Sequence, residues 1–378
     1  MIDVKSYVPI LKWKSAEQRA LHDLNEESKE KMTPLIELVM PKMSSPYKDK
    51  KAKIKKSPEE IFAEVVSKFE EKRTLEIPNE INDSWGKSPV FLDFSLLYGY
   101  NTTNFKIDSI KKIFPAGKNL GLNLIPVVNL NDEEEIKKEV AALSEMHGGL
   151  CLRITASNLD DIKLLNEKIK NFLAAYNLKE SNIDLLIDIK SIDSNDVIYQ
   201  KYVNRSQEIE SLENWRSLVL ASGAFPVDFS ECKFGEPKFL PKLDWQNWLS
   251  YVYNKPLRRR MTFADYTMRN PIFKESNQFY SPTTTISYCM DKDWVIMKGK
   301  KLRFDLYLAN AKLLVDDSGY FYGKDFSSGD QFIHEKARHY ENYMKNPKIK
   351  GTGGSEDWIY ACINHHLVLT KDLISNLP

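Results

Sequence analysis

The sequence predicts an α/β protein with a TIM-type (β/α)8 barrel, followed by a C-terminal hairpin and a helical extension. Short runs rich in Val, Ile, Leu and Phe recur through the first three quarters of the chain, and charged segments with helical spacing separate them. This alternation is typical of βαβ units, whose parallel strands are buried on both faces. Eight units over roughly 260 residues have the size of a closed barrel.

Eight apolar runs are the predicted barrel strands, because residues that are apolar at successive positions suit a strand without a solvent-exposed face. In chain order they are Tyr7–Leu11, Pro34–Val39, Val90–Phe94, Leu124–Leu130, Leu150–Ile154, Ile183–Ile189, Ser217–Ala221 and Met261–Tyr266. The last strand has a second candidate, a hairpin near residue 290. A doubly wound open sheet is the alternative architecture, but no GxGxxG follows the first strand, which weakens its dinucleotide-binding version.

The charged segments between the strands have the caps expected of helices. Ser57 begins the sequence SPEE, which combines an N-cap serine, a proline at the first helical position and two acids in the first turn. The predicted helices are Ser15–Lys31, Ser57–Arg73, Asp132–Met146, Asn158–Tyr176 and Ser206–Asn214. Helices that connect parallel strands in this way are expected outside the barrel.

The pattern changes after the eighth run. The segments Thr283–Cys289 and Trp294–Lys298 flank a short Asp-Lys-Asp turn and predict a β-hairpin. Three further helices are expected at Lys301–Leu314, Phe326–Tyr343 and Asp357–Ser375. We therefore expect a barrel at residues 1–300 and a C-terminal helical extension at residues 301–378, packed over one mouth or side of the barrel.

Composition and motifs exclude several classes of protein. The net charge of +1 provides no global field for nucleic acid or an anionic membrane. The four cysteines form no CxxC pair, and the HExxH, EF-hand, GxSxG and GxxxxGK[ST] patterns do not occur. The N-terminal segment lacks signal-peptide features, and no apolar run approaches the ~18 residues of a membrane span. We expect a cytoplasmic protein without a membrane partner.

Polar side chains close nearly every predicted strand, at the end where barrel enzymes carry their active sites. Four are acids and are the candidate catalytic residues: Glu37, Asp93, Asp188 and Asp265. Up to four are basic and are candidate ligand-binding residues: Lys12, Lys14, Arg153 and Lys190. Carboxylates in such a cluster bind Mg²⁺ or perform acid–base chemistry, while the bases hold phosphate. The identity of any metal stays open.

The same charges also have a structural interpretation. Barrel interiors can hold buried ion pairs, and Arg153 with Asp93 or Asp188 is a candidate pair. Strand parity decides which residues reach the lumen, because a residue one place along the strand points into the helix layer. The sequence leaves this choice open.

Tyr266 and His365 complete the set of candidate ligand-binding residues. Tyr266 closes the eighth run, and His365 precedes His366 in a predicted helix. Adjacent helical residues point about 100° apart, so the two histidines cannot form an i, i+4 metal pair, and one of them is expected to face the core.

Two basic runs offer a different kind of site. Lys48–Lys56 and Arg258–Arg260 are interpreted either as solvated charge or as contacts for phosphate or nucleic acid. Solvated charge is the more common role of such runs.

Several short segments, taken in their order along this chain, resemble a known family. They are YVPILKWKSAEQRAL, TPLIELV, FLDFS, NLIPVVNL, LCLRIT, LLIDI, SGAFP, FADYT, ISYCMDKDWVIMKG, FSSGDQFI and DWIYACINHHL. Together they are similar to the Beta protein family, whose namesake lies in the phage gop–beta–cII locus. The resemblance implies a role in antiviral defence carried by a prophage or genomic island, and it assigns no catalytic residue. Lys48–Lys56 is not part of the shared pattern.

Two functions from different classes follow as hypotheses. The first is a bacterial anti-phage defence protein that acts on or binds a phosphorylated or nucleotide ligand at the barrel mouth, with Mg²⁺ as a candidate cofactor. The second is a non-catalytic recognition or regulatory module that binds a phage protein or controls a co-encoded defence protein. Nucleic-acid binding through the two basic runs is a third option.

Overall fold

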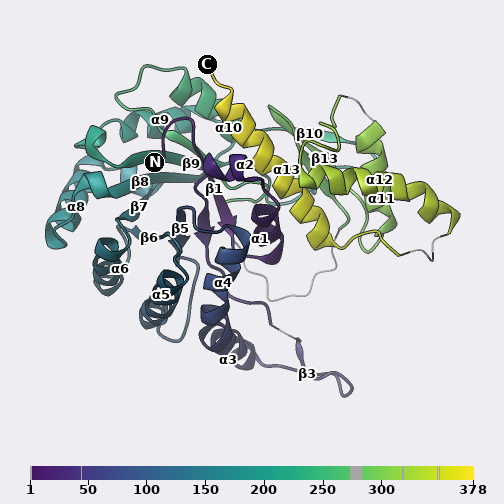
Figure 1. Ribbon diagram of the computed structural model, residues 1–378, viewed down its shortest axis with the longest axis horizontal. Coiled ribbons are helices and arrows are strands. Elements are labelled where there is room, and N and C mark those ends of the chain that lie inside the picture. The colour runs from purple at the N-terminus through teal and green to yellow at the C-terminus, as the bar shows by residue number, and fades with distance from the viewer. Residues whose placement is uncertain (1, 44, 273–282, 317–318, 347, 349) are drawn as a thin grey trace.

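The structure is a computed structural model that describes residues 2–43, 45–272, 283–316, 319–346, 348 and 350–378. Its main body is a closed barrel of eight parallel strands surrounded by helices (Figure 1), so the predicted TIM-type barrel is confirmed. The strands follow one another around the barrel in the order β1-β11-β9-β8-β7-β6-β5-β2. Their bounds are β1 (Tyr7–Lys12), β2 (Leu35–Glu37), β5 (Val90–Asp93), β6 (Leu124–Asn129), β7 (Leu150–Thr155), β8 (Ile183–Ser191), β9 (Ser217–Gly223) and β11 (Thr262–Asp265).

Alternate residues of these strands fill the lumen of the barrel. The lumen cluster consists mainly of apolar side chains: Val8, Ile10, Leu35, Phe91, Ile125, Val127, Cys151, Leu186, Val219, Ala221, Ala264 and Tyr266. Residues one place along the strands, such as Tyr7 and Leu11, belong to a separate cluster between the barrel and its helices. The period of two therefore assigns each strand residue to one of the two layers.

Helix α3, one of the helices around the barrel, begins at a strong cap. Ser57 accepts a hydrogen bond from the N–H of Glu60 at 3.2 Å, and the Ser57 N–H donates to the Glu60 carboxylate at 3.0 Å, which completes a capping box. The barrel helices are α1 (Ser15–His22), α2 (Glu26–Glu30), α3 (Pro58–Lys68), α4 (Thr74–Ser84), α5 (Thr102–Asn119), α6 (Glu134–Met146), α7 (Ala156–Leu159), α8 (Ile162–Ala175), α9 (Asp196–Ser206) and α10 (Leu243–Trp248).

Three of the predicted helices differ from the structure. The segment Asn158–Tyr176 begins in α7 and continues in α8, because Asp161 accepts a hydrogen bond from the Leu164 N–H and caps a new helix. The segment Ser15–Lys31 is divided into α1 and α2, because Asn25 accepts a hydrogen bond from the Ser28 N–H and caps a new helix. The predicted helix Ser206–Asn214 is wrong. Helix α9 ends at Ser206, and the left-handed backbone of Ser211, with φ of 52°, is incompatible with a continuous α-helix.

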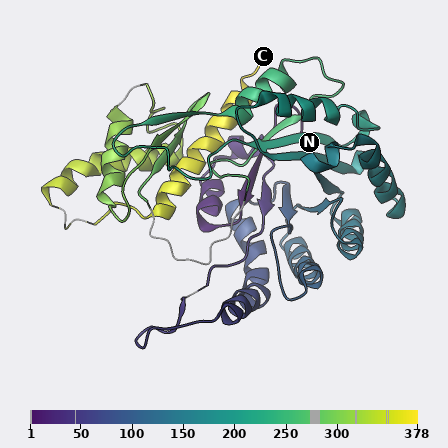
Figure 2. The ribbon, with the colours of Figure 1, turned by 180° about the vertical axis from the view of Figure 1, so that it is seen from behind.

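A second lobe follows the barrel (Figures 1 and 2). The predicted hairpin is confirmed, and it pairs with a strand inserted between β9 and β11 to form an antiparallel sheet of order β10-β13-β12. The sequence analysis did not identify this inserted strand. The lobe comprises β10 (Lys238–Pro241), β12 (Ile286–Cys289), β13 (Asp293–Met297), α11 (Asp305–Asp316) and α12 (Ser328–Lys345), and it is followed by α13 (Ser355–Ser375).

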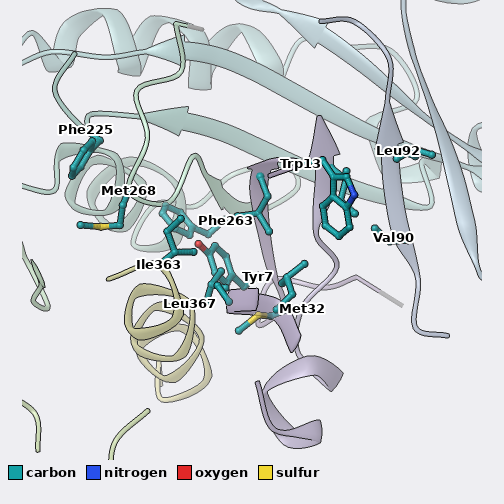
Figure 3. Packing of buried hydrophobic residues seen from close by; sticks show 14 of the residues in the cluster. Tyr7, Trp13, Met32, Val90, Leu92, Phe225, Phe263, Met268, Ile363 and Leu367 are labelled. Atoms are coloured by element: carbon teal, nitrogen blue, oxygen red, sulfur yellow. The ribbon is translucent and has the colours of Figure 1, made fainter. Parts of the chain in front are cut away.

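Helix α13 lies between the barrel and the second lobe (Figures 1 and 2). It contacts α1 and β1 on the barrel side and α12 and β12 on the lobe side. Figure 3 shows Ile363 and Leu367 of α13 beside Tyr7, whose ring stacks on Phe263 with 6.0 Å between centroids. Residues 360–367 are all buried, as expected for a helix covered on all sides. Across the described ranges, no helix is long and apolar enough to cross a membrane.

The contact between α12 and α13 depends on Gly329. A Cβ at this position would lie 2.1 Å from the carbonyl oxygen of Ala361, and the Gly329 N–H donates to Asn364 at 2.8 Å. We expect Gly329→Ala to lower the free energy of unfolding by about 1–3 kcal/mol, because the two backbones must separate. Urea unfolding measures this change. Gln331→Ala, an exposed substitution in α12, should change it by less than about 0.5 kcal/mol, and equal effects of the two would contradict the prediction.

Candidate functional site

The strand ends at one mouth of the barrel carry polar side chains on the lumen side. Each follows a lumen-facing apolar residue by two positions, so parity directs it inward. Glu37 pairs in register with Lys12 on one side and with Asp93 on the other. These polar residues are Lys12, Glu37, Asp93, Arg153, Asp188 and Tyr266.

Arg153 is the centre of this cluster. Its guanidinium donates to three carboxylates: Nη1 to Asp93 at 2.5 Å, Nη2 to Glu37 at 2.9 Å, and both Nε and Nη2 to Asp188 at 3.1 and 2.7 Å. Nη2 also donates to the hydroxyl of Tyr266 at 2.8 Å. All five side chains are at most 2% exposed, so these ionic hydrogen bonds are made where the dielectric constant is low.

Lys190 connects the network to solvent. Its Nζ donates to the Tyr266 hydroxyl at 2.9 Å and forms an ion pair with Asp188 at 2.9 Å, while the same hydroxyl donates to Asp188 at 2.6 Å. The side chain of Lys190 is 39% exposed, in contrast to the buried members of the cluster. Its left-handed backbone, with φ of 59°, is uncommon for a residue other than glycine and is held by the Asp188 carboxylate, which accepts from the Lys190 N–H.

The charges of the cluster determine its protonation states. Burial raises the pKa of Asp188, but the positive charges of Arg153 and Lys190 outweigh this and lower it to about 2. The pKa of Asp93 is also lowered, since Arg153 outweighs the effect of burial. Burial and the charge of Asp188 raise the pKa of Tyr266 well above its usual value. Near neutral pH, Asp93 and Asp188 are therefore ionised and Tyr266 is protonated.

Lys12 is a buried cation beside this network. Its Nζ lies 5.6 Å from the ring centroid of Tyr266 and donates to the carbonyl of Asn270 at 3.2 Å. Burial lowers the pKa of Lys12 and the charge of Glu37 raises it, while the charge of Arg269 and other nearby cations lower it, so that it falls to about 8. Lys12 therefore remains mainly protonated at pH 7, and a bound anion would raise its pKa.

A cavity of about 500 Å³ opens at the same mouth, beside the end of β1. It is bordered by the segments that follow β1, β2 and β11, by α3 and α4, and by the first turn of α13. Six basic and four acidic side chains line it, which gives it an excess of positive charge. They are Lys14, Lys42, Lys68, Lys72, Arg73 and Arg269 against Glu17, Glu76, Glu80 and Glu356.

Ion pairs hold the wall of this cavity in place. Arg73 donates to both Glu76 and Glu80 at 2.8 Å, and Arg269 donates to Glu17 Oε1 through Nε at 3.0 Å and Nη2 at 2.9 Å. Glu17 is fully buried, and its Oε2 has no hydrogen-bond partner among the described residues. A buried carboxylate oxygen at the edge of a cavity is suited to accept a hydrogen bond from a ligand.

The structure brings most of the predicted site residues together. Six lie in the lumen or at its opening, a placement that the sequence analysis left open, and Tyr266 lies with them. Lys14 borders the neighbouring cavity. Two predicted residues, Asp265 and His365, lie elsewhere. The seven that meet are Lys12, Glu37, Asp93, Arg153, Asp188, Lys190 and Tyr266.

Asp265 lies on the outer face of β11, because its position alternates with the lumen-facing Ala264 and Tyr266. There it accepts a hydrogen bond from the Tyr7 hydroxyl at 2.5 Å, and its other oxygen lies 2.8 Å from Nε2 of His366. Strand parity therefore separates Asp265 from the other three acids.

His365 lies in the core of the second lobe. Its Nδ1 lies 2.7 Å from Asp330, its Nε2 lies 2.8 Å from the carbonyl oxygen of Cys289, and its ring stacks on Tyr288 with 4.0 Å between centroids. These contacts use both ring nitrogens, and they hold His365 away from the barrel mouth.

The carboxylates of the lumen face Arg153. Within the described part of the chain, no group of three or more His, Cys, Asp or Glu residues is arranged to hold a metal ion.

Neither of the two basic runs lines the cavity at the mouth. Lys48–Lys56 forms a hairpin of β3 (Tyr47–Asp49) and β4 (Ile54–Lys55) that projects from the barrel (Figure 1). Arg258–Arg260 precedes β11 and so lies at the opposite end of the strand from the mouth. Arg258 is paired with Glu213 at 2.8 Å.

Sequence analysis missed Glu17 and Arg269 as site residues. Glu17 lies in an amphipathic helix, where an acid is normally solvated, and only the packing of α1 shows that it is buried. Arg269 lies a few residues beyond the eighth strand, so a search of the whole loop after each strand would have found it.

This chain is similar in sequence to one protein family and in structure to a solved enzyme. No curated protein matches this chain. A solved structure described as a GH138 enzyme targeting pectin rhamnogalacturonan II is similar with a TM-score of 0.34 and 10% sequence identity, over 89% of this chain and 43% of that one. This chain thus spans less than half of that protein's length. The profile of the family described as Beta protein matches residues 7–370, nearly the whole sequence. The chain therefore belongs to the Beta protein family.

Proposed function

We propose that this protein is a bacterial anti-phage defence protein that binds a phosphorylated or nucleotide ligand at the mouth of its barrel. The observation that carries the ligand class is the cavity of about 500 Å³ at the strand ends, with its excess of basic side chains. Clefts of this size hold small organic ligands, and barrel proteins bind them at this face. The defence role rests on the phage-associated locus of the family's namesake.

In this proposal, the phosphate lies near Lys14 and Lys42, and the lumen charges lie behind it. Lysine ammonium groups neutralise phosphate oxygens without fixing a single geometry. Glu17 accepts a hydrogen bond from a hydroxyl or amino group of the same ligand through its unpartnered oxygen. Lys12, which remains mainly protonated at neutral pH, adds its positive charge to the field.

The three lumen acids have a positioning role in this proposal. Glu37, Asp93 and Asp188 hold Arg153 rigid, and Asp188 also holds Lys190 at the opening. A preorganised cation costs little reorganisation when an anion arrives or when negative charge develops on a bound ligand. The same arrangement therefore suits either binding or catalysis.

A second candidate function is a non-catalytic module that recognises a phage protein or regulates a co-encoded defence protein. The observation that favours it is the closed network around Arg153, in which the three carboxylates already have hydrogen-bond partners inside the protein. Closed networks of this kind are found where ion pairs stabilise a scaffold.

Thermal unfolding with a panel of nucleotides and inorganic pyrophosphate tests the ligand. We expect at least one of them to raise the melting temperature of the wild type, because a ligand that binds only the folded state stabilises it by about 2.7 kcal/mol at 100 times its Kd. The double variant Lys14→Ala/Lys42→Ala should lose this shift. It should also lose protection in a phage plating assay, while its melting temperature without ligand stays close to that of the wild type.

Lys201→Ala is the matched control, since Lys201 is a half-exposed lysine paired with Asp160 on another face. This variant should keep both the ligand shift and the protection. Protection that survives in the double variant, with no shift in the wild type, would favour the recognition module over the ligand-binding protein.

A further inference from the structure

A second group of reactive side chains lies between the barrel and the second lobe, away from the cavity at the mouth. Cys289 at the end of β12, His366 of α13 and Asp265 on the outer face of β11 meet there, with Lys242 at the start of α10. All four side chains are at most 1% exposed. Ionisable groups buried so completely are costly unless they balance one another.

Cys289, His366 and Asp265 form a relay. His366 Nδ1 lies 3.2 Å from the Cys289 sulfur, and its Nε2 lies 2.8 Å from Asp265 Oδ2. Tyr7 donates to the other oxygen of Asp265 at 2.5 Å. The carboxylate thus fixes the imidazole ring, and the ring presents its second nitrogen to the sulfur. This is the arrangement by which a base activates a cysteine nucleophile.

Lys242 is a buried lysine beside this relay. Its ammonium is buried, and within the described residues Nζ has no hydrogen-bond partner. Burial lowers the pKa of Lys242, but the negative charges of Cys289, Asp244 and Asp265 raise it above its usual value. A buried ammonium that is not anchored by a hydrogen bond is stabilised here by negative charge on its neighbours, and Cys289 makes the largest such contribution.

The positive charges of Lys242 and His366 determine how much of the Cys289 thiol is ionised. Burial raises the pKa of Cys289, but Lys242 and His366 outweigh this and lower it to about 7. Burial lowers the pKa of His366, while Asp265 and Cys289 raise it to about 9. A large fraction of the molecules at neutral pH therefore holds a thiolate beside an imidazolium. Cys151 and Cys362 are also buried, but burial raises the pKa of both thiols.

We propose that Cys289 is a modification site for hydrogen peroxide, with its thiolate as the nucleophile. The sulfur attacks one oxygen of the peroxide, an S–O bond forms and the O–O bond breaks. The His366 imidazolium gives its proton to the departing hydroxide, so that hydrogen peroxide yields sulfenic acid, water and neutral imidazole. Sulfur is oxidised by two electrons, and each of the two peroxide oxygens is reduced by one.

The class of reactant follows from the burial of the sulfur. A substrate much larger than water would require α13 to separate from β12, because Cys289 is fully buried between them. Hydrogen peroxide is uncharged and close to water in size, so it reaches such a site through small fluctuations of the packing. Asp265 is a positioning residue in this scheme, since it acts through His366.

The test exposes the intact protein to hydrogen peroxide at pH 7 and then alkylates the remaining thiols with N-ethylmaleimide in denaturant. Mass spectrometry of the peptides gives the fraction of each cysteine that escaped alkylation. We expect Cys289 to be oxidised at least 10-fold faster than Cys151 and Cys362, since reactivity follows the thiolate fraction. Oxidation of Cys289 no faster than these equally buried thiols would overturn the proposal, and this comparison needs no variant.

A pair of lysine variants tests the role of the cluster. Lys242→Met keeps the volume of the side chain and removes the charge, so the rate at Cys289 should fall at least 10-fold. Lys371→Met removes another buried lysine, on α13, and should leave the rate unchanged. An unchanged rate in Lys242→Met, with both variants folded by circular dichroism, would show that the cluster does not activate the thiol.

Discussion

Replacing Arg153 by methionine is expected to lower the free energy of unfolding by about 3–5 kcal/mol. The substitution leaves Glu37, Asp93 and Asp188 buried without their shared cation. Three carboxylates in a region of low dielectric then repel one another, and none of them can reach bulk water. Equilibrium unfolding in urea at pH 7 measures the loss.

The pH dependence separates this explanation from a packing defect. In the wild type the pKa of Asp188 is lowered to about 2, so its contribution to stability is present above the unfolded pKa near 4 and is lost as the pH falls through 2. In Arg153→Met, Asp93 and Asp188 lose the positive charge that lowers their pKa values, and burial raises them. The variant should therefore recover stability as the pH falls from 7 to 5, while the wild type should not.

Two other substitutions are the controls for the loss of stability in Arg153→Met. Arg153→Lys keeps the charge but not the planar fork, so an intermediate loss is expected. Arg258→Met removes an exposed arginine paired with Glu213 and should cost less than about 1 kcal/mol. A loss below about 1 kcal/mol in Arg153→Met would show that the network contributes little to stability.

Asp265 and His366 should show strong energetic coupling in a double-mutant cycle. Each of the single variants Asp265→Asn and His366→Gln is expected to cost about 3 kcal/mol, because each leaves a charged group buried beside a neutral one. The double variant should cost at least about 1.5 kcal/mol less than the sum, since the shared interaction is lost only once. Urea unfolding of the four proteins gives the coupling energy.

The control for this cycle pairs Asp265→Asn with Lys201→Ala, whose side chains share no partner. These two changes should add within about 0.5 kcal/mol. Additivity in the Asp265–His366 cycle as well would mean that α13 is held to β11 by apolar packing alone, and the relay to Cys289 would lose its energetic basis.

Much of the barrel could be predicted from the sequence, because the patterns that indicate strands and helix starts are local. Apolar runs at successive positions identified all eight strands, including Met261–Tyr266 as the last, and SPEE marked the start of α3. The wrong helix prediction also has a local cause. The helix predicted at Ser206–Asn214 was displaced because the charged, helix-compatible segment is divided by the left-handed turn at Ser211.

Part of the candidate site could also be predicted from local sequence patterns. A charged residue inside an apolar strand is visible in the sequence, and Glu37, Asp93, Arg153 and Asp188 were identified in this way. The pairing of Arg153 with Asp93 or Asp188 was an open alternative, and the structure shows that it pairs with both. The third carboxylate comes from β2, which is not a neighbour of β7 in the closed strand order and reaches Arg153 across the lumen.

The sequence by itself determined which residues form strands, which strand positions carry charge, and the family to which the chain belongs. Only the tertiary structure decided where those charges meet. Closure of the barrel placed three acids around Arg153, while parity on β11 directed Asp265 outward. Docking of α13 then brought His366 to Cys289, 77 residues away along the chain. Hydrophobic periodicity is set by neighbouring residues, whereas contacts between distant side chains depend on the closure and packing of whole elements, which no local pattern encodes.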